Sequence, residues 1–159
     1  MILKVSYKGK WYNLPEENLE LEEVYKSGDL IFLELDEEIE RLECVELYEF
    51  EELFKEKGLN TLLELVEKIE QEKIEFLAVY WYTGGLKYCW KQFLNEDYTV
   101  IHDINSEYDL GYYLVDEGYF GNIPDNLINY IDYELIGRDA IFGDNWRIIK
   151  KYRVAVYMN

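Results

Sequence analysis

The spacing of apolar residues changes from strand-like to helical and back along this chain. The first 12 residues predict a β-hairpin, because an alternating apolar run is followed by a lysine–glycine–lysine turn and by two aromatic residues that suit the second strand. Residues 29–35 form an apolar run that predicts a buried strand. Residues 15–25 predict a short helix that begins at a proline, and the acidic residues 37–43 fit either a helix or a connection. We therefore expect a β-rich subdomain over residues 1–45.

Residues 46–94 carry the apolar period of amphipathic helices. A first helix is expected to stop at Gly58, and Thr61 and Glu64 have the spacing of a capping box for a second helix. Residues 74–82 are ambiguous, because their valine, tyrosine and tryptophan content suits a strand whereas their apolar spacing favours a helix. A further helical face follows a glycine pair. This part therefore predicts a helical subdomain.

Residues 95–159 mix strand and helix patterns. Residues 98–102 have the composition of a strand, and Ser106, three residues before an aspartate, predicts a helix N-terminus. Residues 141–158 predict a hairpin or strand pair, with the clearest strand pattern at residues 154–157. Together the three parts predict an α+β fold built from small subdomains, the last of them mixed α and β.

One acidic helix is expected to run from Pro124 to Gly137, since proline suits the first turn and glycine the left-handed stop. In such a helix Leu127, Ile131 and Leu135 would lie on one side, within a buried aliphatic and tyrosine face. Asp125 and Asp132 would share the opposite, solvent-exposed face.

Acidity is the most informative feature of the composition. The chain carries 34 acidic and 16 basic residues, a net charge of −18, and 49% of its residues are apolar, with 16 tyrosines and 4 tryptophans. Such charge alone favours disorder, but this apolar content is enough for a core. Residues 31–80 contain 16 acids and 5 bases, and residues 94–139 contain 11 acids and 1 base. We expect a folded polyanion, and imitation of a nucleic acid is one of the few functions that require one.

The same composition excludes several classes of function. The sequence has no zinc-type cysteine pair and no phosphate-binding glycine loop, and His102, its single histidine, has no nucleophile motif beside it. We therefore expect no enzyme activity, no cofactor and no metal site. Cys44 and Cys89 are expected to be buried, reduced thiols. With no signal-peptide pattern and no segment long enough to span a membrane, a cytoplasmic protein is expected.

The partner of such a chain is expected to be basic, because a polyanion has no affinity for phosphates or for membrane surfaces. Acids three and four residues apart on a helix lie about 5–6 Å from each other, so a row of them can approximate a row of phosphates. Glu64, Glu67 and Glu75, with Glu70 or Glu72, are expected to form such a row. The alternative is that these faces only confer solubility, but residues 94–139 lack the interleaved lysines of an ordinary soluble helix. The candidate partner-binding carboxylates are Glu64, Glu67, Glu70, Glu75, Asp103, Glu107, Asp109, Asp116, Glu117, Asp125, Asp132, Glu134 and Asp139.

Residues 127–139, with the sequence LINYIDYELIGRD, resemble the signature of the ArdA-type antirestriction proteins. That family carries a Leu-x-x-Tyr-Ile-Asp-Tyr-x-x-x-Gly-Arg-Asp pattern near its C-terminus. The matching positions are Leu127, Tyr130, Ile131, Asp132, Tyr133, Gly137, Arg138 and Asp139. Similar residues extend the resemblance over residues 95–159, whereas residues 3–10 depart from the strand that usually opens the family.

The resemblance implies an elongated chain of three small domains, a homodimer formed through the C-terminal part, and carboxylates arrayed like bent B-form DNA. Its implied target is the DNA-binding groove of a Type I restriction–modification complex, formed by specificity and modification subunits, in a bacterial host that receives plasmid or phage DNA. It also implies that Arg138 and a buried Tyr130 or Ile131 serve folding or dimer contact. A second hypothesis is an anti-CRISPR or other anti-defence inhibitor of a basic DNA-binding protein. A third is an acidic adaptor or immunity protein that binds one basic partner.

Overall fold

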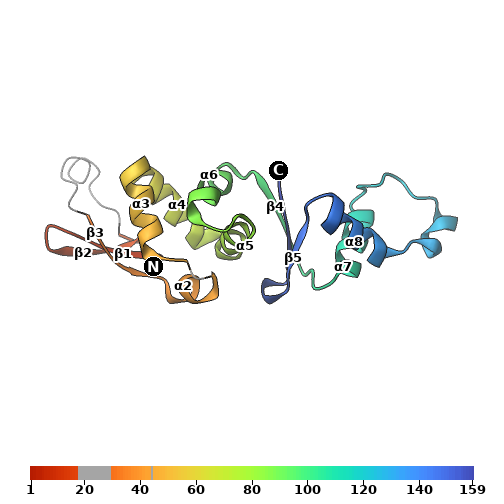
Figure 1. Ribbon diagram of the computed structural model, residues 1–159, viewed down its shortest axis with the longest axis horizontal. Helices are drawn as coiled ribbons and strands as arrows, with labels where there is room; N and C mark the ends of the chain where they lie inside the picture. Colours follow the sequence, from red (N-terminus) through yellow and green to blue (C-terminus); the bar gives the residue numbers. More distant parts are fainter. Residues whose placement is uncertain (18–29, 44) are drawn as a thin grey trace. The chain divides into compact units, whose positions relative to one another are not determined.

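The computed structural model describes residues 1–17, 30–43 and 45–159, which form two compact units, Met1–Glu96 and Asp97–Asn159 (Figure 1). Each unit contains one small antiparallel sheet together with helices. This arrangement confirms the predicted α+β class. The further division of the first unit into a β-rich and a helical subdomain stays a prediction.

The sheet of the first unit has the strand order β2-β1-β3. Its strands are β1 (Leu3–Tyr7), β2 (Lys10–Leu14) and β3 (Ile31–Leu35). The β1–β2 pair confirms the predicted hairpin. The predicted buried strand exists as β3, but its burial was wrong, since Ile31 is 58% exposed. The reason is that β3 lies at an edge of the sheet. The predicted helix over residues 15–25 falls mostly outside the described residues.

The helices of this unit are α2 (Glu37–Glu43), α3 (Leu47–Lys57), α4 (Leu59–Gln71), α5 (Lys73–Thr83) and α6 (Leu86–Asn95). Helix α5 confirms the helical interpretation of its ambiguous sequence. The predicted capping box of Thr61 and Glu64 was wrong, because α4 already begins after Gly58. The Thr61 hydroxyl instead donates to the carbonyl of Lys57, 3.4 Å away. The largest fully buried side chains include Phe50, Phe76 and Phe93.

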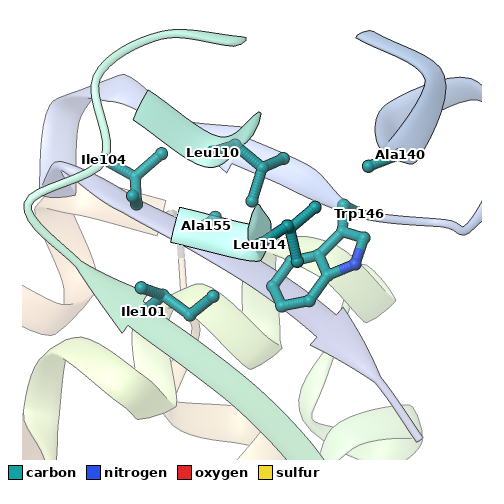
Figure 2. Close-up of a cluster of buried hydrophobic side chains, with 7 residues drawn as sticks. All are labelled: Ile101, Ile104, Leu110, Leu114, Ala140, Trp146 and Ala155. Atoms are coloured by element: carbon teal, nitrogen blue, oxygen red, sulfur yellow. The ribbon is translucent and has the colours of Figure 1, made fainter. Parts of the chain in front are cut away.

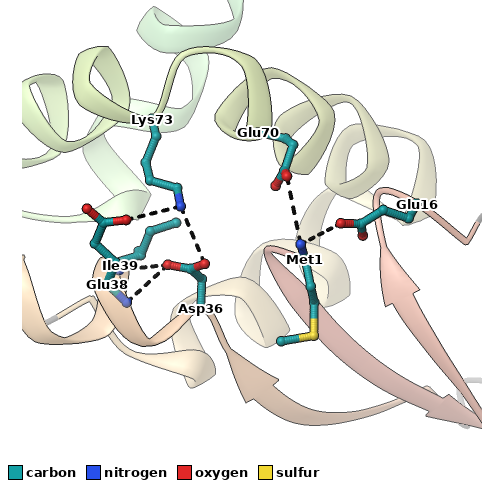
Figure 3. Close-up of polar contacts among 7 residues, drawn as sticks. All are labelled: Met1, Glu16, Asp36, Glu38, Ile39, Glu70 and Lys73. Atoms are coloured by element: carbon teal, nitrogen blue, oxygen red, sulfur yellow. Dashed lines mark hydrogen bonds and ion pairs between the residues drawn. The ribbon is translucent and has the colours of Figure 1, made fainter.

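Ion pairs join the sheet side of this unit to its helices (Figure 3). The ammonium of Lys73 on α5 lies 3.4 Å from carboxylate oxygens of both Asp36 and Glu38. Partial burial alone lowers the pKa of Lys73, but the two carboxylates outweigh that effect and raise it. The N-terminal ammonium of Met1 pairs with Glu16 and, at 3.8 Å, with Glu70 on α4. Several acids of this unit are therefore occupied by the fold's own cations.

The sheet of the second unit has the strand order β4-β6-β5. Its strands are β4 (Tyr98–His102), β5 (Arg147–Ile149) and β6 (Val154–Met158), and its helices are α7 (Glu107–Asp116), the 3-10 helix η1 (Asp125–Tyr130), α8 (Tyr133–Gly143) and the 3-10 helix η2 (Lys150–Tyr152). The predicted strand and the Ser106 cap are confirmed, since the Ser106 hydroxyl accepts from the Asp109 amide at 3.1 Å. Ile141 and Phe142, assigned to a hairpin from sequence, lie in α8 instead.

A buried apolar cluster forms the core of this second unit (Figure 2). Leu110 and Leu114 from α7 and Trp146, which precedes β5, meet strand residues in it. The full cluster is Ile101, Ile104, Leu110, Leu114, Ala140, Trp146 and Ala155. The helix α7 is thereby fixed with Leu110 and Leu114 in the core, and Tyr108, Tyr112 and Asp116 are exposed.

The single acidic helix predicted from Pro124 to Gly137 was wrong. The chain forms η1, passes through an extended residue at Ile131, and starts α8 after Asp132. A new helix begins there because the Asp132 carboxylate accepts a hydrogen bond from the Leu135 amide at 3.0 Å, which satisfies a donor of its first turn. The supposed common face of Asp125 and Asp132 therefore does not exist.

Candidate partner-binding surface

The segment with the family-like signature is organised around two glycines where α7 and α8 touch through their backbones. A Cβ atom placed on Gly137 would lie 1.8 Å from the carbonyl oxygen of Glu107, and one placed on Gly111 would lie 1.8 Å from that of Tyr133. The sequence predicted that Gly137 ends a helix, and this prediction was wrong. Gly137 lies inside α8 and permits a contact that no side chain would allow.

Two further signature residues complete this helix pair. Asp132 caps α8, and the ring of Tyr133 packs between two tyrosines of α7. The centroid of the Tyr133 ring is 5.4 Å from that of Tyr108 and 5.2 Å from that of Tyr112, in tilted and edge-on geometries that aromatic pairs favour. The signature thus specifies how α8 starts and how it packs on α7.

Arg138 ties the helix pair together by charge. Its guanidinium lies 3.5 Å from the carboxylate of Glu107 on α7 and 3.6 Å from that of Glu134, one turn earlier on α8. These are half-exposed pairs, so each contributes only about 0–1 kcal/mol. Two of the candidate carboxylates are therefore partly neutralised by this arginine.

Tyr130 was expected to be buried, but it is 84% exposed. It ends η1, outside both helices of the pair, so nothing in the unit's core covers it. Phe142 on α8 is similarly open, at 80%. The large exposed apolar side chains of α7, α8 and the segment between them are Tyr108, Tyr112, Tyr119, Phe120, Leu127, Ile128, Tyr130, Leu135 and Phe142. Exposure of this extent is typical of surfaces that bind another protein.

The candidate acids of the first unit occupy two helices rather than one. Glu64, Glu67 and Glu70 lie on α4 and are exposed, at three-residue spacing opposite its buried face. Glu75, predicted in the same row, lies half-buried in α5, because the helix is interrupted at Glu72. The row on α4 is therefore shorter than the sequence indicated.

Some acids of the second unit are paired within the unit, and others are not. Asp103 pairs with Arg153 at 3.5 Å, and Asp109 accepts a hydrogen bond from the Asn105 amide at 3.0 Å. Of the candidate carboxylates, those that are exposed and have neither an ion pair nor a hydrogen bond within the described residues are Glu64 and Glu67 in the first unit and Asp116, Glu117, Asp125 and Asp139 in the second. We refer to these six as the unpaired carboxylates. They have the charge available for a partner.

Sequence reasoning missed a further acidic row on α3. Glu49, Glu52 and Glu56 follow one another at three- and four-residue spacing on one side of that helix. The spacing rule that selected the acids of α4 would also have selected these. Sequence reasoning also missed Gly111, whose contact with Tyr133 depends on a helix 22 residues away in the chain.

Other candidate chemistry is not assembled in the described part of the chain. His102 lies exposed at the end of β4, and no group of three His, Cys, Asp or Glu side chains among the described residues is placed to hold a metal ion. Cys89 is buried, and burial raises its thiol pKa to about 12, whereas Cys44 lies outside the described residues. Among the described helices, none is long and apolar enough to cross a membrane.

Comparison with known families gives a match that covers nearly the whole chain. A family model described as "Antirestriction protein (ArdA)" matches residues 6–152. The match extends the resemblance into the first unit, where it covers β2 and the end of β1. A search of curated proteins gives no significant match.

Proposed function

The chain belongs to the ArdA family of antirestriction proteins, and we propose that it acts by presenting carboxylates to a groove in which a restriction–modification enzyme binds DNA. The observation that carries this proposal is the set of six unpaired carboxylates, which are exposed on folded elements of both units. Their charge needs no partner within the described fold and remains available to an external cation.

The physical basis of such competition is counterion release. A DNA-binding groove gains affinity when its lysines and arginines displace ions from phosphates. A folded polyanion can replace the phosphates with carboxylates that are already held in position, so little ordering entropy is lost on binding. Inhibition by this route needs no catalytic residue and should weaken as salt is added.

The target we propose is the groove formed by the specificity and modification subunits of a Type I enzyme. Family membership supports an enzyme of restriction as the partner, and the acidity of the chain supports a basic surface on it. The competing hypothesis is that the chain binds another basic DNA-binding defence protein. The experiment must distinguish that target from a Type I enzyme.

We further propose that the chain acts as a homodimer through its second unit. Support comes from the exposed apolar side chains of that unit, especially Tyr130 and Phe142. Light scattering across a dilution series tests this: the parent should dissociate at much lower concentration than a Tyr130→Ser, Phe142→Ser double variant. Equal masses for both at every concentration would refute a dimer through these residues.

The function is tested by titrating the protein into a Type I methyltransferase core bound to fluorescent cognate DNA, at two salt concentrations. Displacement near stoichiometry, weaker at the higher salt, is the expected result. No displacement at large excess would reject this target, and the same titration against other defence complexes would follow.

Because the proposed contact is distributed, single substitutions should have small effects. Changing Asp125 or Asp139 alone to asparagine should weaken displacement by less than about threefold, the effect of one exposed charge pair. Changing Glu64, Glu67, Asp116, Asp125 and Asp139 together to amides should weaken it by at least about tenfold. Complete loss of displacement from one single substitution would instead indicate that one carboxylate makes an essential, specific contact.

A further inference from the structure

The first unit contains a cavity of about 330 Å³ between α3 and the start of α6. A volume of this size is at the lower end of the range, about 300–1,000 Å³, of pockets that hold small ligands. One wall comes from α3, with Tyr48, Glu52 and Glu56, and the other from the glycine turn and α6, with Tyr88 and Trp90. The cavity therefore combines aromatic rings with carboxylates.

The aromatic residues at its mouth are open to solvent. Tyr48 is 55% exposed and Tyr88 is 59% exposed, although both line the same cavity from opposite walls. Two exposed rings facing one cavity offer faces on which a flat or cationic group can stack.

One carboxylate that lines the cavity, that of Glu49, is held in place by the fold. One oxygen of Glu49 accepts from the Leu86 amide at 3.0 Å, and the other accepts from the Tyr80 hydroxyl at 2.8 Å and the Glu46 amide at 3.1 Å. Its charge is thus fixed in place in the lining of the cavity.

The two remaining acids of this wall differ. Glu56 pairs with Lys57 at 3.2 Å, and the ammonium of Lys57 also lies 5.5 Å from the centre of the Trp90 ring. Glu52 has neither an ion pair nor a hydrogen bond within the residues that the structure describes. Lys87 also lines the cavity, and its ammonium lies 5.9 Å from the centre of the Tyr88 ring. Two of the chain's own lysines therefore already lie over aromatic rings of the cavity, so an incoming cation would stack on Tyr48 or replace Lys87 at Tyr88, and Glu52 is left to pair with it.

We propose that this cavity is an anchor pocket for one arginine side chain of the basic partner, with the guanidinium stacked on Tyr88 or Tyr48 and paired with Glu52. An arginine suits the pocket better than a lysine, because its planar guanidinium can stack on a ring and bind a carboxylate through two N–H donors at once. The proposal rests on the proposed function in that it assumes a cationic protein partner, and it adds a local contact to the distributed charge.

The test uses the isolated protein and arginine with both ends blocked, followed by NMR at constant ionic strength. The signals to watch are the amides of Gly84 and Gly85 and the ring of Tyr88, which line the cavity. The control ligand is blocked citrulline, which has the same shape as arginine without the charge. Saturable shifts confined to these signals with arginine, and their absence with citrulline, are the expected result.

Variants locate the site. Glu52→Gln and Tyr88→Ala should each weaken arginine binding by about two- to fivefold, the range of one exposed ion pair or cation–π contact. Glu40→Gln, which removes an exposed acid from α2 in the same unit, should leave the binding unchanged. Both pocket residues are exposed or at the surface, so the folded spectrum should persist in all three variants.

The proposal is overturned by shifts that spread without saturation over every acidic face, by equal shifts with citrulline, or by full binding in both pocket variants. Equal binding of blocked lysine would overturn the choice of a guanidinium. The outcome is separable from that of the DNA displacement experiment. Displacement without arginine binding would reject the pocket and leave the function, whereas arginine binding without displacement would reject the Type I target and leave the pocket.

Discussion

Substitution of Gly137 by alanine tests the packing of α7 on α8 most directly. The added Cβ would lie 1.8 Å from the Glu107 carbonyl oxygen, whereas ordinary contact begins at 3.4 Å. The helices would therefore have to separate by roughly 1.5 Å, and dispersion contacts along the interface would weaken. The obstacle is backbone, so no side-chain rotation relieves it.

The expected magnitude follows from two opposing effects. Overpacking of this kind costs about 1–3 kcal/mol, and a backbone obstacle places it at the upper end. Alanine in place of glycine inside a helix returns up to about 1 kcal/mol. The net loss is therefore about 2 kcal/mol, which lowers the melting temperature of a unit of this size by about 8–16 °C.

The assay must report on the second unit alone, because the two units need not unfold together. The indole N–H signal of Trp146, which lies in the buried cluster of that unit, serves this purpose in a thermal or urea series. The matched control is Gly143→Ala at the end of the same helix, where an added Cβ meets nothing within 4 Å. Equal stability of Gly137→Ala and Gly143→Ala would refute the inferred close contact.

Three further predictions concern single side chains. Asp132→Ala should destabilise the second unit by about 1 kcal/mol because α8 loses its cap, whereas Asp139→Ala should change its urea midpoint little. Glu49→Ala should destabilise the first unit by about 2 kcal/mol in urea unfolding, since the Tyr80 hydroxyl and two amides lose their acceptor. Burial raises the pKa of Cys89 from 9.0 to about 12. Above pH 9, ionisation of the thiol therefore stabilises only the unfolded chain. Stability should then fall by up to about 1.4 kcal/mol per pH unit between pH 9 and 11, and Cys89→Ala should reduce that slope. A slope unchanged by the variant would contradict the assigned cause.

Local signals in the sequence predicted most elements of the fold. The glycines at the ends of α3 and α5 and the serine before α7 act through bonds within a few residues, so their positions are sufficient. Gly137 is different, because a glycine that stops a helix and a glycine that contacts a neighbouring helix look alike in one sequence. Only the position of Glu107, 30 residues earlier, distinguishes them.

The candidate surface could be predicted only in part, because local spacing indicates which acids are exposed but not which of them are paired. Exposure of Glu64 and Glu67 follows from the amphipathic period of α4. The pairing of Glu107 with Arg138 and the interruption of the acidic row at Glu72 depend on contacts and breaks that the spacing of acids does not encode. The exposure of Tyr130 was missed because the predicted helix around it does not form.

The glycine contact between α7 and α8 also bears on how this protein can change over generations. Two helices joined through backbone atoms at Gly111 and Gly137 need few outward-facing side chains to hold them together. Mutations can therefore add, remove or move acids on the outer faces without repacking the interior. A lineage can therefore vary its surface charge while two glycines preserve the packing of α7 on α8.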